Sequence, residues 1–365
     1  MKITFVLPYA GLSGGIRVVA IYARLLRDRG HTVYILSNAR KFSIRDTLKT
    51  LIRCRKLVFG LKKHGSSHLD TEDPFWITVN RAGPIKNKDV PDSDIVIATW
   101  WKTAEWVSRL SPAKGRKIYF CQGFETHHEK YKKRAEATYY LPMTQICVSR
   151  WVCESINNLT GRNDQKLVLN GISLESFFPA PGVKRDLHCF GFLFSEARIK
   201  GVDIIIEALN KAKAINPNIS SVAFGSSFPS ESTNIPPWIE FYKDPPAEMI
   251  CQIYSRCNAW LFGSREEGFG LPILEAMACK TPVIATPAGA ARDLISDDYG
   301  SLIPYEDPDA MAQQIIKFSR MSLECWEQKS NAAYRAAQKH NWESSVSRFE
   351  SILLKVKEDT VYEGS

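Results

Sequence analysis

The chain has 365 residues, of which 44% are hydrophobic and 24% charged, and its formal net charge is +9. A single hydrophobic core seldom extends beyond about 250–300 residues, so this length predicts two domains. No apolar run approaches the roughly 20 residues that a membrane-spanning helix needs, and the opening MKITFVLPYA fits a buried strand better than a signal peptide. We therefore expect a cytoplasmic protein whose nine scattered cysteines stay reduced.

The charge is divided unevenly along the chain. Residues 1–178 hold 29 Lys and Arg against 15 Asp and Glu, a balance of +14, whereas the remainder holds 19 against 24, a balance of −5. Such a division indicates an anionic partner for the first part: a membrane, an anionic substrate or a nucleic acid. Because no nucleic-acid-binding module is recognisable, we expect no nucleic-acid partner.

Apolar strands alternate with helical stretches along the whole chain, which is typical of a parallel α/β sheet. The pattern stops at a linker near Pro179–Val183 and then starts again. This predicts two doubly wound halves, residues 1–178 and 184–345, and a C-terminal helix and tail at 346–365. Strands are expected at 2–8, 31–37, 94–99, 117–121, 144–149, 187–194, 219–225, 258–264, 281–286 and 300–305.

A basic segment at residues 40–65 carries nine Lys or Arg and one Asp, with apolar residues near one helical face. A basic amphipathic helix suits an anionic membrane surface. The same apolar side could instead pack on its own domain, and the sequence leaves both alternatives open.

A glycine-rich loop, with Gly11, Gly14 and Gly15, separates the first strand from the first helix. Glycine lets a phosphate approach the backbone, and free amides at a helix start bind anions. The loop matches neither G-x-G-x-x-G nor the P-loop pattern. A plain tight turn therefore remains an alternative to a phosphate contact.

The segment 262–286 places two glutamates, Glu267 and Glu275, eight positions apart around a glycine turn and a predicted helix start at Leu271–Pro272. Carboxylates and free amides around one cavity could bind a polyhydroxylated ligand, although a capped helix with a glycine turn would look the same. Upstream, Arg198 and Lys200 precede a predicted helix start, where two cations would suit a diphosphate or simply be solvated.

Together these segments resemble the retaining GT-B glycosyltransferases of family four, which use nucleotide-sugar donors. EGFGLPILEAMACKTPVIAT is similar to the family's E-x7-E signature, and further similar segments follow the family's order between Lys2 and Leu354. The resemblance implies the GT-B fold, with two Rossmann-like doubly wound domains, an inter-domain cleft and a C-terminal helix that returns to the N-terminal domain. The other similar segments are GGIRVVAIYARLLRDRGHTV, VLNGISLESFFP, IKGVDIIIEAL and HNWESSVSRF.

The resemblance also implies a role for each feature. Arg198 and Lys200 would neutralise the leaving diphosphate, while Glu267 would position the transferred sugar and Glu275 would bind the ribose. The nucleobase would lie near Phe241–Lys243. The donor-binding set that the resemblance implies is Gly14, Gly15, Gly268, Phe269, Gly270, Leu271 and Glu275.

Two departures from the family pattern affect the site. The family has Gly-Arg after the first strand of the second half, but here Phe192 follows Gly191, so we expect Arg198 to replace the missing cation. Where many relatives carry a histidine in the first half, this chain has Gln122, with Glu125 shortly after it. That pattern resembles a subgroup in polysaccharide assembly that includes rhamnan-type enzymes, so both side chains are expected to face the acceptor or the reacting sugar.

The expected activity is hexosyl transfer from a nucleotide-diphosphate sugar to a glycan or lipid-linked acceptor in cell-surface polysaccharide biosynthesis, peripheral to the inner face of the plasma membrane. We expect no cofactor and no metal, because cations and a helix dipole can stabilise the leaving diphosphate and the D-x-D string Asp92–Asp94 lies far from the donor motif. A nucleotide-sugar epimerase and a non-catalytic glycan- or membrane-binding protein remain alternatives. The sequence does not determine the donor base, the sugar, the acceptor or the linkage.

Overall fold

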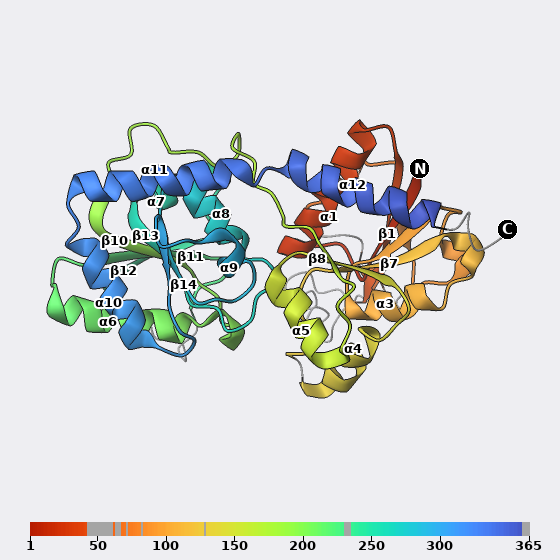
Figure 1. Ribbon diagram of the computed structural model, residues 1–365, viewed down its shortest axis with the longest axis horizontal. Helices are drawn as coiled ribbons and strands as arrows, with labels where there is room; N and C mark the ends of the chain where they lie inside the picture. Colours follow the sequence, from red (N-terminus) through yellow and green to blue (C-terminus); the bar gives the residue numbers. More distant parts are fainter. Residues whose placement is uncertain are drawn as a thin grey trace, which may run out of the picture. The chain divides into compact units, whose positions relative to one another are not determined.

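The computed structural model describes residues 1–41, 61–62, 67–70, 72–81, 83–127, 129–229 and 235–359. The chain divides into two compact units (Figure 1). Nearly all of the predicted basic segment 40–65 lies outside the described residues, so both of its alternative roles stay predictions. Unit 1 comprises Met1–Cys147, Ile156–Val168 and Val346–Ser365, and unit 2 comprises Val148–Ser155 and Leu169–Ser345.

Unit 1 is built on a seven-stranded parallel sheet with the strand order β5-β2-β1-β6-β7-β8-β9. The sequence order reverses between β1 and β6, where Phe5 pairs with Ile35 on one side and Ile97 on the other. The central strands are buried on both faces, which explains their nearly continuous apolar sequences. The strands are β1 (Lys2–Leu7), β2 (Thr32–Asn38), β5 (Trp76–Val79), β6 (Ile95–Ala98), β7 (Arg116–Cys121), β8 (Thr144–Cys147) and β9 (Lys166–Leu167), beside a small β3 (Arg40–Lys41) and β4 (Leu61–Lys62) pair.

The C-terminal helix packs on the unit 1 sheet beside α1 (Figure 1). Phe349 of this helix lies 4.6 Å from the ring of Tyr22 and contacts Phe5 and Phe120. Glu350 binds Arg29 at 2.5 Å and so ties the helix to the end of α1. The helices of unit 1 are α1 (Gly14–Asp28), α3 (Trp101–Ser108) and α4 (Lys132–Thr138), with short 3-10 turns η1 (Asn87–Asp89), η2 (Pro112–Lys114) and η3 (Glu129–Tyr131). Two helices, α5 (Arg150–Thr160) and α12 (Trp342–Glu358), begin in unit 2 and end in unit 1.

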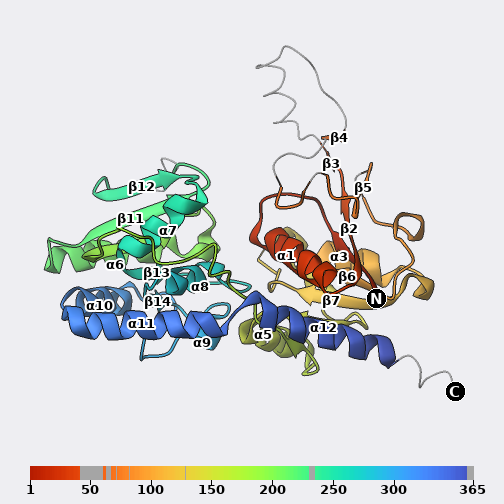
Figure 2. The same cartoon turned by 90° about the horizontal axis from the view of Figure 1, so that it is seen from above.

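Unit 2 repeats this architecture with six parallel strands in the order β12-β11-β10-β13-β14-β15. The sequence order reverses between β10 and β13, and Figure 2 shows β12 at the outer edge of the sheet. The strands are β10 (Asp186–Leu193), β11 (Ser220–Gly225), β12 (Ile239–Lys243), β13 (Cys257–Phe262), β14 (Val283–Ala285) and β15 (Gly300–Leu302).

Helices cover both faces of the unit 2 sheet (Figure 1). On one face α6 and α10 pack over a core that includes Phe190, Phe192 and Met311. On the other face α7 and α8 pack against β13, where the ring of Trp260 lies 4.4 Å from that of Tyr254, and α11 packs on α8. The helices are α6 (Val202–Ile215), α7 (Ala247–Arg256), α8 (Leu271–Ala278), α9 (Ala291–Leu294), α10 (Pro308–Ser319) and α11 (Leu323–Lys339), with the short turn η4 (Arg198–Lys200) before α6.

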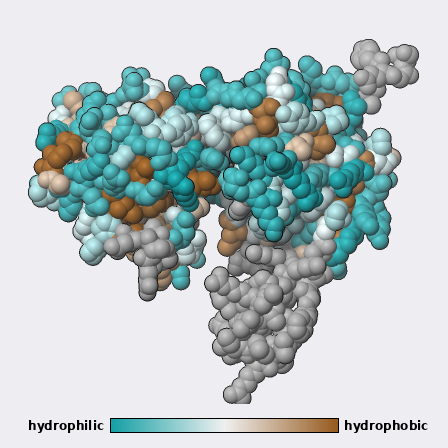
Figure 3. Space-filling model, turned by 90° about the horizontal axis from the view of Figure 1, so that it is seen from below, coloured by the Kyte–Doolittle hydropathy of each residue, from teal (hydrophilic) through white to brown (hydrophobic). Residues whose placement is uncertain are grey.

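Hydrophilic residues dominate the described surface in the view of Figure 3, with hydrophobic residues in small groups. Among the described helices, none is both long enough and apolar enough to cross a lipid bilayer. In doubly wound folds, ligands bind outside the carboxyl ends of the strands, where the strand order reverses.

Candidate active site

The carboxyl ends of β10 and β13 lie side by side where the strand order of unit 2 reverses. β10 leads into the turn η4, and β13 leads through the segment 263–270 into α8. Doubly wound sheets bind their ligands at such a reversal. The predicted donor residues of the second half all lie on these two segments or on α8.

The structure brings Lys200 and Glu267 into direct contact. The Lys200 ammonium lies 2.5 Å from Oε2 of Glu267, and the two side chains are 30% and 18% exposed. The amide of Gly268 donates to the other carboxylate oxygen at 3.3 Å. A charge-assisted bond of this kind is stronger than a neutral one, and the sequence did not indicate that these two residues would bind each other.

A close approach of two glycines fixes these segments against each other. Gly201 has a φ of +60°, and a Cβ at that position would lie 1.8 Å from the carbonyl oxygen of Gly263. The Arg265 amide also donates to the Ile199 carbonyl at 2.8 Å. Only glycine fits position 201, because an L side chain would meet both the backbone clash and an unfavourable conformation.

Arg265 is a residue that sequence reasoning missed. Its guanidinium binds both carboxylate oxygens of Asp203, at 2.8 and 2.7 Å, and also binds Glu306 and the Arg198 carbonyl. The pKa of Arg265 is raised above its usual value, mainly by the hydrogen bonds to Asp203. Since the partners lie 62 and 41 positions away in the sequence, no local pattern could have identified this network.

Phe192, which stands where we expected the family's arginine, does not lie at the phosphate site. Phe192 is fully buried in the apolar core with Phe190 and Phe194, and β10 continues beyond it to Leu193. A cation at position 192 would therefore lie inside the core of unit 2 and not at the strand end. Arg198, in contrast, is exposed at the start of η4.

The glycine turn before α8 forms as the sequence predicts, and the helix begins at Leu271. Gly270 has a φ of +89°, and a Cβ there would lie 2.9 Å from the ring of Phe262. The side chain of Phe269 is buried, and its carbonyl accepts from the Ala290 amide at 2.8 Å. The turn that carries the signature is thus held by buried contacts on both sides.

Glu275 is only 7% exposed, and the hydroxyl of Tyr254 donates to its Oε2 at 3.0 Å. A buried carboxylate is costly unless hydrogen bonds compensate for lost hydration. Tyr254, on α7, was not identified from the sequence, because a tyrosine within an amphipathic helix looks like an ordinary core residue.

Unit 1 contains a cavity of about 260 Å³ at the carboxyl ends of β1, β6 and β7. It brings together the predicted residues Gly15, Gln122 and Glu125. A Cβ on Gly15 would lie 3.3 Å from Oε1 of Gln122, whereas Gly14 is exposed with open space around it and does not line the cavity. The other lining residues are Leu7, Pro8, Tyr9, Ser13, Ile16, Thr99 and Trp100.

Glu125 is held by groups that carry no positive charge. Its Oε2 accepts from the Trp101 amide at 2.8 Å and from the Tyr119 hydroxyl at 3.2 Å, while its own amide donates to the Tyr139 hydroxyl at 2.9 Å. Burial raises the pKa of Glu125 to about 8, even though both bonds to the carboxylate oppose that rise. Near neutral pH this carboxyl group is therefore largely protonated.

The acidic residues of the D-x-D string form ion pairs with lysines. Asp92 pairs with Lys114 at 2.7 Å, and Asp94 pairs with Lys357 at 3.1 Å. Near the expected nucleobase position, the Lys243 ammonium lies 5.0 Å from the ring centre of Phe228. In the described part of the chain, no three His, Cys, Asp or Glu side chains gather as metal ligands.

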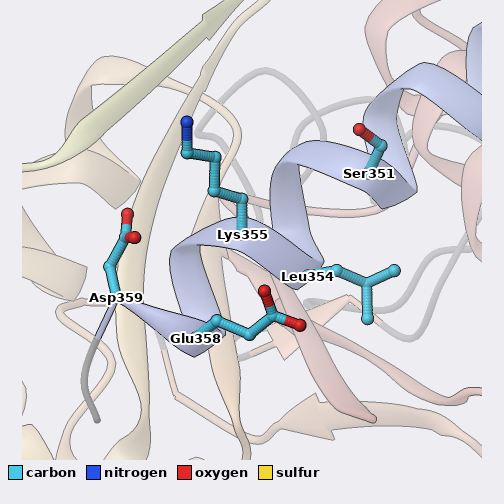
Figure 4. A pocket seen from close by; sticks show the side chains of 5 residues that line it. All are labelled: Ser351, Leu354, Lys355, Glu358 and Asp359. Carbon is cyan, nitrogen blue, oxygen red and sulfur yellow. The ribbon is translucent and has the colours of Figure 1, made fainter. Parts of the chain in front are cut away.

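A second hollow, of about 490 Å³, runs along the last turns of α12 (Figure 4). It is lined by one helix only, and none of the predicted site residues lies there. Its lining consists of Ser351, Leu354, Lys355, Glu358 and Asp359.

Part of the chain is similar in sequence to known glycosyltransferases. Residues 188–340 match the family model of glycosyl transferases group 1. A phosphatidyl-myo-inositol mannosyltransferase of Mycolicibacterium smegmatis is 28% identical over 87% of this chain and 84% of its own length. Other relatives align over a smaller share of the chain. An uncharacterised glycosyltransferase of Methanocaldococcus jannaschii is 27% identical over 47% of this chain and 48% of its own length, so this chain spans about half of that relative. O-antigen chain mannosyltransferase B of Escherichia coli is 29% identical over 30% of this chain and 29% of its own length.

Solved structures of low identity share the fold. HepE of Anabaena, solved in complex with UDP, superposes with a TM-score of 0.73 at 18% identity, over 97% of this chain and 100% of that one. The sucrose-phosphate synthase of Thermosynechococcus elongatus superposes with a TM-score of 0.71 at 18% identity, over 98% and 99%. These likenesses show that the chain has the GT-B fold and that residues 188–340, which carry the E-x7-E turn, are similar to group 1 glycosyltransferases.

Proposed function

We propose that the protein transfers a sugar from a nucleotide-diphosphate sugar to a hydroxyl group of a glycan or lipid-linked acceptor, with retention of the anomeric configuration. The observation that carries this proposal is the 2.5 Å contact between Lys200 and Glu267 at the strand reversal of unit 2. It joins the residue expected to meet the diphosphate to the residue expected to meet the sugar. Donor binding is assigned to residues 184–345 and acceptor binding to residues 1–178.

On the donor side, a bound diphosphate would compete with Glu267 for the Lys200 ammonium. The exchange would release the Glu267 carboxylate, which could then accept hydrogen bonds from sugar hydroxyls near the amides of residues 268–270. Arg198, exposed two positions before Lys200, supplies a second cation. Cations that stabilise the leaving group in this way do the work that a metal ion does in other transferases, so we propose a reaction that needs no metal.

The mostly buried carboxylate of Glu275 is assigned to the ribose hydroxyls. HepE, which shares the fold, was solved with UDP, UDP-glucose and glucose, and this supports a nucleotide sugar as the donor here. The rings of Phe228 and Phe241 lie with their centres 6.1 Å apart at an angle of 41°, beside Lys243, and either ring could stack on the base.

On the acceptor side, the unit 1 cavity offers hydrogen-bonding groups without a net charge. Gln122 can donate and accept, and the protonated carboxyl group of Glu125 can do the same. Such a lining suits a hydroxyl-rich acceptor. The names of the relatives from M. smegmatis and E. coli support a lipid or polysaccharide acceptor, and we propose that the enzyme works at the cytoplasmic face of the plasma membrane, with the segment 40–65 as its contact.

A thermal-shift screen tests the donor assignment. UDP, GDP, dTDP and ADP are added separately, followed by their sugars, and one of them is expected to raise Tm by a few degrees because it binds only the folded protein. The absence of any shift at saturating concentration would contradict the proposal. Product analysis separates the alternatives, since an epimerase would interconvert nucleotide sugars without an acceptor and a glycan-binding protein would leave them unchanged.

A further inference from the structure

Tyr254 lies between the core of unit 2 and the second glutamate of the signature. Its side chain is fully buried, and its ring packs 4.4 Å from Trp260 and 5.9 Å from Phe224. From this fixed ring the hydroxyl donates to Oε2 of Glu275 at 3.0 Å. Because the ring cannot reach solvent, Tyr254 can affect a ligand only through its neighbours.

The main chain of Tyr254 is fixed as well. Its carbonyl oxygen accepts from the Arg185 guanidinium at 3.1 Å and from the Thr281 hydroxyl at 2.7 Å. The same guanidinium binds the carbonyl oxygens of Cys279 and Lys280, just after α8, at 3.1 and 3.2 Å. One cation thus joins the ends of the two helices that carry Tyr254 and Glu275.

We propose that Tyr254 is a positioning residue for the nucleotide donor: its hydroxyl holds the Glu275 carboxylate in the orientation that accepts the ribose hydroxyls. The inference rests on the proposed function, which assigns the ribose to Glu275. The terminal torsion of a glutamate side chain is broad, so each bond that orients the Glu275 carboxylate before the donor arrives lowers the entropy cost of binding. A carboxylate that is already oriented avoids this cost and binds more tightly.

The test measures the Kd of two probes, UDP and its 2′,3′-dideoxy analogue, for the wild type and for Tyr254→Phe. If the thermal-shift screen identifies another base, the corresponding pair of nucleotides is used. Tyr254→Phe is expected to raise the Kd of the ribonucleotide about tenfold, since the loss of one buried bond to a charged group has an effect of this order. The Kd of the dideoxy analogue should change less than twofold, because it lacks the hydroxyl groups that Glu275 would bind. The maximal rate at saturating donor should stay within about twofold.

Tyr299→Phe is the matched control, because it removes a tyrosine hydroxyl that donates to the Leu294 carbonyl at 3.0 Å in the same unit. It should leave both affinities unchanged. An equal loss of affinity for both probes in Tyr254→Phe would mean a general structural role and would overturn the inference. The inference would also be overturned if Tyr254→Phe bound the ribonucleotide as tightly as the wild type while Glu275→Ala lost binding. That result would leave the proposed function intact. A wild type that binds no nucleotide would instead refute the proposed function itself.

Discussion

In unit 1, Glu125 follows β7 and accepts hydrogen bonds from the Trp101 amide and the Tyr119 hydroxyl, whereas in unit 2, Glu267 follows β13 and binds the Lys200 ammonium. Both carboxyl groups lie beyond the carboxyl ends of parallel strands near a reversal of strand order. Their neighbours give them opposite characters. Burial among uncharged groups raises the pKa of Glu125 to about 8, while Glu267 is paired with a cation.

The two units therefore show how one architecture can carry two kinds of chemistry, because the loops and not the sheets supply the functional groups. Unit 1 presents groups that are largely neutral at pH 7, which suits a hydroxyl-bearing acceptor. Unit 2 presents cations and carboxylates, which suit an anionic donor. Each of the following experiments alters one side of this contrast.

Removal of the Lys200 ammonium group from the candidate donor site should have the largest effect on activity. Lys200→Met is expected to lower kcat/KM about 10²–10³-fold, the usual cost of losing one group that stabilises charge on a leaving group. The release of nucleoside diphosphate from the donor sugar measures it. Lys211→Met is the control, since this exposed lysine on α6 pairs only with surface carboxylates. A loss below tenfold for Lys200→Met would mean that the cation is not central to the donor site.

The loops of unit 2 are locked by backbone contact, whereas Gly15 in unit 1 meets only a side chain. Gly201→Ala is expected to destabilise unit 2 by about 3 kcal/mol or more, since it combines a positive φ with a severe clash. Gly30→Ala is the control for the effect of the positive φ alone, because Gly30 has a φ of +84° and open space around it. It should lower the free energy of unfolding by only about 1 kcal/mol. Urea denaturation measures both, and equal costs would show that the contact with Gly263 is unimportant.

The neutral character of unit 1 can be tested through pH. The pKa of Glu125 is raised from 4.5 to about 8 in the folded protein, so the folded state keeps a proton that the unfolded state releases. Stability from this group is fully present below about pH 4.5 and is lost as the pH rises to about 8. Relative to Glu125→Gln, which cannot ionise, the wild type should lose at least about 1 kcal/mol between pH 5 and 8.5, a Tm change of about 2–4 °C.

The measurement is Tm as a function of pH for the wild type, Glu125→Gln and Glu129→Gln, an exposed glutamate a few residues further along the chain. The Glu129→Gln curve should follow that of the wild type. Parallel curves for all three proteins would show that Glu125 ionises normally, and the contrast between the two units would then disappear.

Local patterns in the sequence predicted the parts of the molecule that depend on local physics. The central strands were found because burial on both faces requires continuous apolar runs, and the start of α8 was found because Gly270 and Pro272 mark it. The edge strands β5 and β12 were missed, although the shorter edge strand β15 was found. Figure 2 shows β5 and β12 at the edges of their sheets.

Two residues that sequence reasoning missed act through partners far away in the sequence. The partner of Tyr254 lies 21 positions away, and Arg265 joins segments 62 and 41 positions away, so nothing beside them in the sequence indicates their role. Phe192 shows the limit of a comparison by motif. It follows Gly191 where the family pattern has arginine, yet the structure buries it in the core of unit 2.

The smallest expected effect concerns the glycines at the start of α1. In Gly15→Ala the new Cβ would lie 3.3 Å from Oε1 of Gln122, which is tight enough to displace that side chain by a few tenths of an ångström. The KM for the acceptor should rise about two- to fivefold, because Gly15 lines the unit 1 cavity that is assigned to the acceptor. The KM for the donor tests the separate prediction that Gly15 also contacts the donor. In Gly14→Ala the Cβ meets open space, so both KM values should match the wild type and the helix should gain a few tenths of a kcal/mol. A rise in the donor KM for Gly15→Ala would mean that the unit 1 cavity also serves the donor.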